Sequence, residues 1–157
     1  MRILWLLPLL LIGCTKAAVS AKVLPEVTVQ KARYRAVAND VYYAVRDTLN
    51  EQAYGVAAED LKNGNIITAW MPTSSDSHYV DLFGRRDPSV NPSYYQLDIQ
   101  LETEDGFTTV KVTSKMKSLV SNLKSAGVAE NRLLKGIGKH LRKTEPNITN
   151  LGVSEPE

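Results

Sequence analysis

Two stretches of alternating apolar and polar residues, joined by a short turn, constrain the fold of this chain most. Their apolar positions are Tyr95, Leu97, Ile99, Leu101, Val110, Val112 and Met116, and the turn is Glu104-Asp105-Gly106. Successive side chains of a β-strand point to opposite faces, so the alternation predicts an antiparallel hairpin with one buried face. On its polar face, we expect Asp98 and Glu102 to pair with Lys111 and Lys115.

Two other segments carry the apolar period of a helix. Over residues 39–54 one face collects Val41, Ala44, Val45, Thr48 and Leu49. Asn39 is the expected N-cap and Gly55 the expected C-terminal stop. A second helix is predicted from Asn131, with Leu133, Leu134, Ile137 and Leu141 on one face. Gly136 and Gly138 lie inside it, where each costs about 0.8–1 kcal/mol relative to alanine, so we expect close packing there.

The turn sequence Asn63-Gly64 lies between the apolar runs 56–59 and 66–71 and predicts a further hairpin, which Pro72 ends. Residues 72–93 are predicted to form a long loop, and 117–129 a loop with a short helical turn. The order helix, hairpin, loop, hairpin, helix predicts one α+β domain over 39–143. In this domain, a four-stranded antiparallel sheet has two helices packed on one face.

The N-terminus has an apolar run over residues 3–12, followed by Gly13 and the only cysteine, Cys14. Leu11-Ile12-Gly13-Cys14 resembles the lipobox of bacterial lipoproteins. The resemblance implies a signal peptide over 1–13, a diacylglycerol and further acylation (palmitate-type chains) on Cys14, and stable membrane anchoring. Residues 14–38 would then form the lipid anchor and a tether, with a short strand near 27–29. An ordinary signal cut after Val19-Ser20-Ala21 is the alternative, and it would discard Cys14.

The position after the cysteine is Thr15, where many lipoproteins kept at the inner membrane have aspartate. The resemblance therefore implies the outer membrane, with the chain on its periplasmic face. From residue 144 to 157 the chain is rich in Pro, Asn, Ser and Glu, and we expect a disordered tail.

The residues beyond Cys14 show no catalytic constellation. His78 and His140 are the only histidines, and neither has further ligands at metal-binding spacing. No serine lies in a Gly-x-Ser-x-Gly motif, and residues 133–140 fail the phosphate-loop pattern. We therefore expect a protein that is not an enzyme, with no metal, no cofactor other than the covalent lipid, and no nucleic-acid or small-molecule partner.

Aromatic residues and arginines gather in the predicted loop 72–93. Such residues are enriched at protein interfaces, so we expect a partner-binding site at Tyr79, Leu82, Phe83, Arg85 and Arg86. The alternative is that the aromatic and aliphatic members fold back onto the domain.

Charge is distributed unevenly along the chain. Residues 111–143 contain 9 basic residues and one acid, whereas 40–110 contain 12 acidic and 4 basic residues. The basic half suggests an alternative, anion-binding site at Lys135, Lys139, Arg142 and Lys143. A solvated helix face would produce the same pattern.

Val41-Tyr42-Tyr43-Ala44-Val45 and Asn63-Gly64-Asn65-Ile66-Ile67-Thr68-Ala69-Trp70 are similar to repeats of the BamC lipoproteins of the β-barrel assembly machinery. The lipopolysaccharide-assembly lipoprotein LptE has a comparable arrangement of elements. The resemblance implies a helix-grip-like domain and a non-enzymatic accessory or scaffold subunit of an outer-membrane complex, such as one for β-barrel assembly. The alternative function is binding of an anionic envelope component: lipopolysaccharide, lipid head groups or peptidoglycan.

Overall fold

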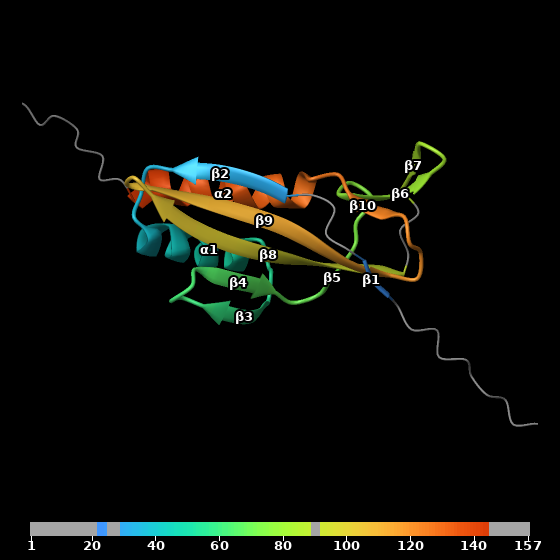
Figure 1. Cartoon of the computed structure of the whole chain (residues 1–157), viewed down its shortest axis with the longest axis horizontal. Coiled ribbons are helices and arrows are strands. Elements are labelled where there is room, and N and C mark those ends of the chain that lie inside the picture. Colours follow the sequence, from blue (N-terminus) through green and yellow to red (C-terminus); the bar gives the residue numbers. More distant parts are fainter. Residues whose placement is uncertain (1–21, 25–28, 89–91, 145–157) are drawn as a thin grey trace, which may run out of the picture.

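The computed structural model describes residues 22–24, 29–88 and 92–144. The predicted signal peptide, Cys14 and all of the predicted tail except Thr144 lie outside these residues. The described part is an α+β fold of two helices and antiparallel strands (Figure 1). In chain order the elements are β1 (Lys22–Leu24), β2 (Val29–Tyr34), α1 (Ala38–Glu51), β3 (Val56–Asp60), β4 (Asn65–Thr68), β5 (Met71–Pro72), β6 (His78–Leu82), β7 (Arg85–Asp87), β8 (Ser93–Glu104), β9 (Phe107–Ser118), β10 (Leu123–Ser125) and α2 (Val128–Thr144).

The predicted central hairpin is confirmed and is longer than the alternation indicated. β8 and β9 are paired from Ser93 opposite Ser118 to Glu104 opposite Phe107. The main sheet has the order β1-β9-β8-β4-β3, with β2 also paired to β9 and β5 to β8. The predicted cross-strand ion pairs are present, since Lys111 Nζ lies 2.5 Å from Glu102 Oε1 and Lys115 Nζ lies 2.6 Å from Asp98 Oδ2.

Both helices pack against the sheet and against each other, and together they close a single core. The predicted face of α1 is buried in full, as are Leu133, Leu134 and Ile137 of α2. From the sheet, the core receives Ile66, Leu97, Ile99, Val110, Val112 and Met116. α1 contacts β8, while α2 contacts β2 and β9, so the two helices lie side by side over the sheet (Figure 1).

The close packing expected at the glycines of α2 occurs at Gly136. A Cβ built there would lie 2.4 Å from Thr48 Cγ2 and 2.9 Å from Gln52 Nε2 of the α1 region. At Gly138 the nearest atom, Tyr34 Cε1, would be 3.5 Å away, an ordinary contact. Gly136 therefore sets how closely the two helices approach.

Three sequence predictions about the sheets are wrong. The sheets contain more than four strands, because residues assigned to the tether form β1 and β2 and pair with β9. Residues 72–93 are no long loop: they form β6 and β7, which pair with β10 in a second, three-stranded sheet. β10 in turn lies in the region 117–129, which was predicted to be irregular. These strands are short, and all except β7 pair with a strand distant in sequence, so their local pattern is weak.

The helix ends also differ from the prediction. Val37, not Asn39, is the N-cap of α1, and its side chain makes no capping hydrogen bond. α1 ends at Glu51, and Ala53, with a φ of 58°, takes the left-handed position expected of Gly55. This early stop carries Tyr54 into the core. α2 begins at Val128, just after Gly127, rather than at Asn131.

Candidate protein-interaction site

The β6–β7 hairpin projects from the body of the domain at the end where the second sheet lies (Figure 1). One face of β6 buries His78 and Val80 in the domain. The next residue on that face, Leu82, lies beyond the core and is exposed. The end of the hairpin therefore extends beyond the core of the domain, and the tip makes few contacts with the rest of the domain.

Phe83 occupies the tip in an unfavourable backbone conformation. Leu82 pairs with Arg85, so Phe83 and Gly84 form a two-residue turn with φ values of 52° and 80°. Such turns favour Asn, Asp or Gly, because side chains with a Cβ rarely adopt positive φ and bulky residues are true outliers. The side chain of Phe83 is also fully exposed. It therefore buries no apolar surface in the monomer that could offset the conformational cost.

Another two-residue turn in the described residues gives a direct comparison. Asp105 and Gly106 connect β8 to β9 with φ values of 51° and 75°. At almost the same geometry the chain has the preferred Asp-Gly there and Phe-Gly at the β6–β7 tip. The geometry of the turn explains why Asp105-Gly106 is found there, but it does not explain Phe83-Gly84.

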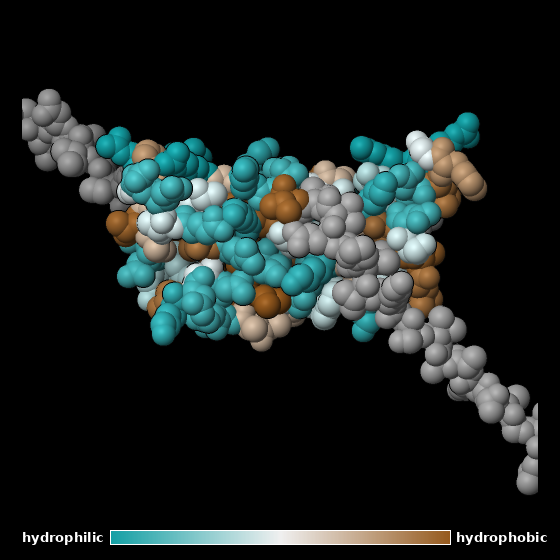
Figure 2. All heavy atoms as spheres, viewed as in Figure 1, coloured by the Kyte–Doolittle hydropathy of each residue, from teal (hydrophilic) through white to brown (hydrophobic). Residues whose placement is uncertain are grey.

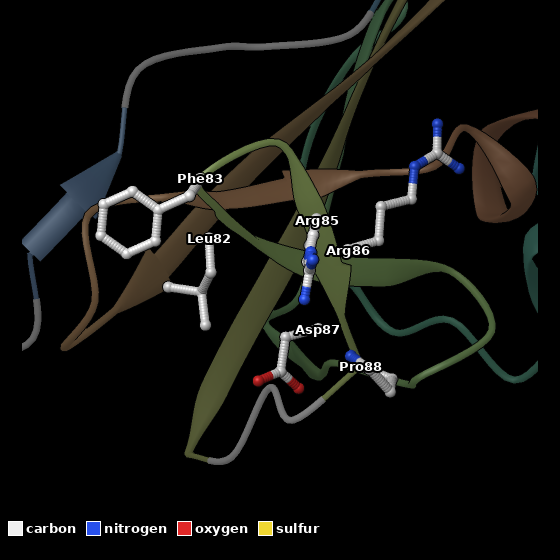
Figure 3. Close-up of a pocket in the computed structure, with 6 residues that line it drawn as sticks. All are labelled: Leu82, Phe83, Arg85, Arg86, Asp87 and Pro88. Carbon is white, nitrogen blue, oxygen red and sulfur yellow. The ribbon is translucent and has the colours of Figure 1, made fainter.

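The hairpin tip forms a concave surface of apolar and charged side chains. A cavity of about 590 Å³ is lined by Leu82, Phe83, Arg85, Arg86, Asp87 and Pro88 (Figure 3). Leu82, Arg85 and Asp87 extend to one side of the ribbon, and Arg86 extends to the other. The Arg86 guanidinium carbon lies 4.7 Å from the centre of the half-buried Tyr79 ring.

The base of the hairpin is held by hydrogen bonds through Asp81. Its Oδ1 accepts from the Gly84 N–H at 3.1 Å, and its Oδ2 accepts from Lys124 Nζ of β10 at 2.5 Å. The hydrogen bond from Lys124 and the positive charge of its ammonium group lower the pKa of the Asp81 carboxyl. Asp81 therefore stays ionised and keeps the turn in place.

The five predicted interface residues thus lie on one hairpin but serve different roles. Three of them have exposed side chains: Leu82, Phe83 and Arg85. The ring of Tyr79 instead packs against the guanidinium group of Arg86. Of the three residues that the alternative would fold back onto the domain, Tyr79 is half-buried, while Leu82 and Phe83 are exposed. The sequence feature that indicates this tip is Phe83-Gly84, at a turn where Asn-Gly or Asp-Gly is usual.

The four residues of the predicted anion-binding site all lie on α2 and are exposed. Lys139 Nζ is 3.6 Å from Glu51 Oε1, so part of this charge is neutralised by α1. Arg142 instead lines a groove of about 810 Å³ between β2, α1 and α2. Arg33 and Arg35 also line it, opposed by Asp40 and Asp47, and Tyr34, Val37 and Leu141 supply apolar surface.

The two histidines have structural surroundings. His78 is buried, its ring 4.4 Å from that of Tyr95, and its Nδ1 accepts from the Ser74 N–H at 3.4 Å. Burial lowers the pKa of His78, although the carboxyls of Glu130 and Asp76 act in the opposite direction. His140 Nε2 lies 2.9 Å from Glu51 Oε2, near the C-terminal end of α2.

Two negative findings apply to residues 22–24, 29–88 and 92–144. No group of three or more His, Cys, Asp or Glu side chains is placed to hold a metal ion. Within the same residues, neither helix is long and apolar enough to cross a membrane.

Comparison with known proteins leaves the family open. No family model matches the chain, and no curated protein matches it. Among solved structures, "Ara h 8.0201" has 12% identity and a TM-score of 0.38, covering 73% of this chain and 97% of the other. A DUF4468 family protein from Bacteroides ovatus has 14% identity and a TM-score of 0.34, covering 82% of each chain. At these TM-scores, neither match assigns a fold family or a function to this chain.

Proposed function

We propose that this chain is a non-enzymatic lipoprotein of the cell envelope, anchored through Cys14 to the periplasmic face of the outer membrane. It acts as an accessory or scaffold subunit of an outer-membrane complex, such as one that assembles β-barrels. We also propose that its two helices over an antiparallel sheet form a helix-grip-like domain. The lipobox-like sequence supports the anchor, and the β6–β7 hairpin tip supports protein binding.

One observation carries the binding role: Phe83 is fully exposed and has positive φ at the hairpin tip. Phe83 lowers the stability of the monomer and contacts almost nothing in it. We therefore expect its role to be a contact with another molecule. Aromatic residues, phenylalanine among them, and arginines are enriched at protein interfaces. The adjoining cavity and Arg85 would surround such an anchor with polar contacts.

The test is photo-crosslinking in cells, with a benzophenone amino acid in place of Leu82. We expect crosslinks to a component of an outer-membrane assembly complex. The same amino acid in place of Glu104, at the equivalent position before the opposite turn, is the matched control and should give none. Equal crosslinking from both positions would contradict a specific site at the tip.

The substitution Phe83→Asn separates binding from folding. Asparagine adopts positive φ readily and gives the preferred Asn-Gly turn, so we expect the free energy of unfolding to rise by about 0.5–1 kcal/mol. The crosslink from residue 82 should weaken in the same variant. If Phe83→Asn lowers stability in urea unfolding, Phe83 has a structural role and the proposed site is wrong.

The second candidate function is binding of an anionic envelope component, which the groove beside Arg142 favours. Arg35 and Arg142 form no salt bridge within the described part of the chain, and both border an apolar floor. Affinity for vesicles containing lipopolysaccharide should then fall steeply between low and physiological salt, because salt screens exposed charges. Binding through the hairpin tip should depend less on salt, and Arg142→Gln should not affect it.

A further inference from the structure

The chain enters the described fold beside a loop with exposed apolar residues. Lys22, the first residue of β1, pairs with Ser118, the last residue of β9. Leu119 and Val120 follow directly, and their side chains are 49% and 45% exposed. Tyr94, which pairs with Lys117 on the neighbouring strand, is 47% exposed. We call Tyr94, Leu119 and Val120 the entry-end patch.

The patch is held in place rather than loosely attached. Ser93 Oγ and Ser118 Oγ share a hydrogen bond of 2.7 Å at its base, and the Val120 N–H donates to Ser118 Oγ at 3.1 Å. The carbonyl of Asn122 accepts from the Asp81 N–H of β6 at 3.0 Å. Leu119 and Val120 are therefore fixed in exposed positions at one end of the molecule. Hydrophobic residues are visible at this end in Figure 2.

Chain length brings this patch close to any lipid on Cys14. Seven residues lie between Cys14 and Lys22, and the eight Cα-to-Cα steps between these two residues span at most about 28 Å when the chain is fully extended. An anchor on Cys14 thus keeps the entry-end patch within that distance of the bilayer. The opposite end of the β8–β9 hairpin, twelve residues along each strand, lies about 37 Å further away along the strands.

The charge at this end is complementary to an anionic surface. Asp76 and Asp81 at this end are paired with Arg132 and Lys124, whereas Asp87 lies on the same side of the hairpin ribbon as Arg85 (Figure 3). Lys117 and Arg85 are exposed, and neither forms a salt bridge within the part of the chain that the structure describes. Basic residues near an anionic leaflet are attracted to it electrostatically.

We infer that the entry-end patch lies against the phospholipid surface to which the chain is anchored, with Leu119 and Val120 in the head-group region. This rests on the proposed lipid anchor and deepens it, because it fixes which end of the domain faces the membrane. The β6–β7 hairpin tip lies at the same end, so its partner would be met at the membrane surface. Tyr94 has the amphipathic character of residues enriched at that boundary.

The test uses the full lipidated chain in vesicles of phosphatidylethanolamine and phosphatidylglycerol. The lipid occupies the only native thiol, so Leu119→Cys adds a single reactive site for an environment-sensitive fluorophore. Glu104→Cys, exposed at the far end of β8, is the matched control. We expect blue-shifted emission and quenching by head-group nitroxide lipids at residue 119, and neither effect at 104. Val120→Cys provides a second site in case the first variant folds poorly.

The outcomes separate this inference from the proposed function. Mass spectrometry of the purified chain first establishes whether Cys14 carries lipid; a mature chain that begins at Lys22 overturns the anchor and, with it, the membrane orientation. If the lipid is present and the labels at 119 and 120 stay as water-exposed as the label at 104, only the orientation is overturned. A shift that requires an added partner protein would also overturn it, by showing that the patch is a protein interface.

Discussion

Several residues of this chain have backbone conformations or helix-end positions that their residue types do not favour. Ala53 and Phe83 have positive φ, whereas Gly55 and Asn39 lack the capping roles that their types favour. For Ala53, a physical reason is visible: the turn carries Tyr54 into the core, where its hydroxyl lies 2.9 Å from that of Tyr95. For Phe83, the monomer offers no such compensation.

His78 is the residue from which we expect pH sensitivity of folding. Burial lowers its pKa below the ordinary value of 6.5, so the unfolded chain binds a proton more readily than the folded one. Stability should therefore be complete above about pH 6.5 and fall as pH decreases below it, by at most about 1.4 kcal/mol per pH unit from this group.

The measurement is urea unfolding between pH 7.5 and 5. His78→Phe, which keeps an aromatic ring against Tyr95, should have a shallower pH dependence than the parent chain. His140→Gln is the control, since His140 is only partly buried and contacts Glu51. Parallel pH profiles for the parent and His78→Phe would show that His78 does not set the dependence.

At the scale of the elements, the helix pair depends on one glycine. Thr48 cannot readily turn its methyl group away from Gly136, because it is buried and its hydroxyl donates to the Ala44 carbonyl at 2.7 Å. We expect Gly136→Ala to lower the free energy of unfolding by about 1–3 kcal/mol, the usual effect of overpacking.

Gly138→Ala is the matched control on the same helix. Its Cβ would make an ordinary contact with Tyr34, and alanine is the better helix former. We expect a gain of about 0.5–1 kcal/mol in urea unfolding. Equal effects from the two substitutions would mean that helix propensity, rather than contact with Thr48, governs position 136.

The elements that the sequence predicted well are those with many periodic residues. The face of α1 that begins at Val41 and the alternation around Ile99 each contain enough repeats to be read locally, and both are confirmed. β6, β7 and β10 have three to five residues each, and β6 pairs with β10 across more than forty positions. No local pattern specifies such a pairing. The candidate site was located by composition. The Phe83-Gly84 pair is present in the sequence, but only the structure shows that it forms a two-residue turn with positive φ at Phe83.

At the scale of the whole molecule, the described chain has two different ends joined by the β8–β9 hairpin (Figure 1). One end has the entry strand β1, the second sheet and the entry-end patch. The Asp105-Gly106 turn lies at the other, and the groove beside Arg142 is formed by β2, α1 and α2. The two proposed binding surfaces are therefore on different parts of the domain.

Asp81 gives the hairpin a mechanical role. Its N–H is bonded to the loop that carries Leu119 and Val120, one carboxylate oxygen to the turn at Gly84 and the other to Lys124. Force applied to Phe83 would pass through these bonds into that loop and β10 before it could bend the hairpin. A partner that pulls on the hairpin tip would therefore also pull on the loop beside β1, and the domain would turn about that loop.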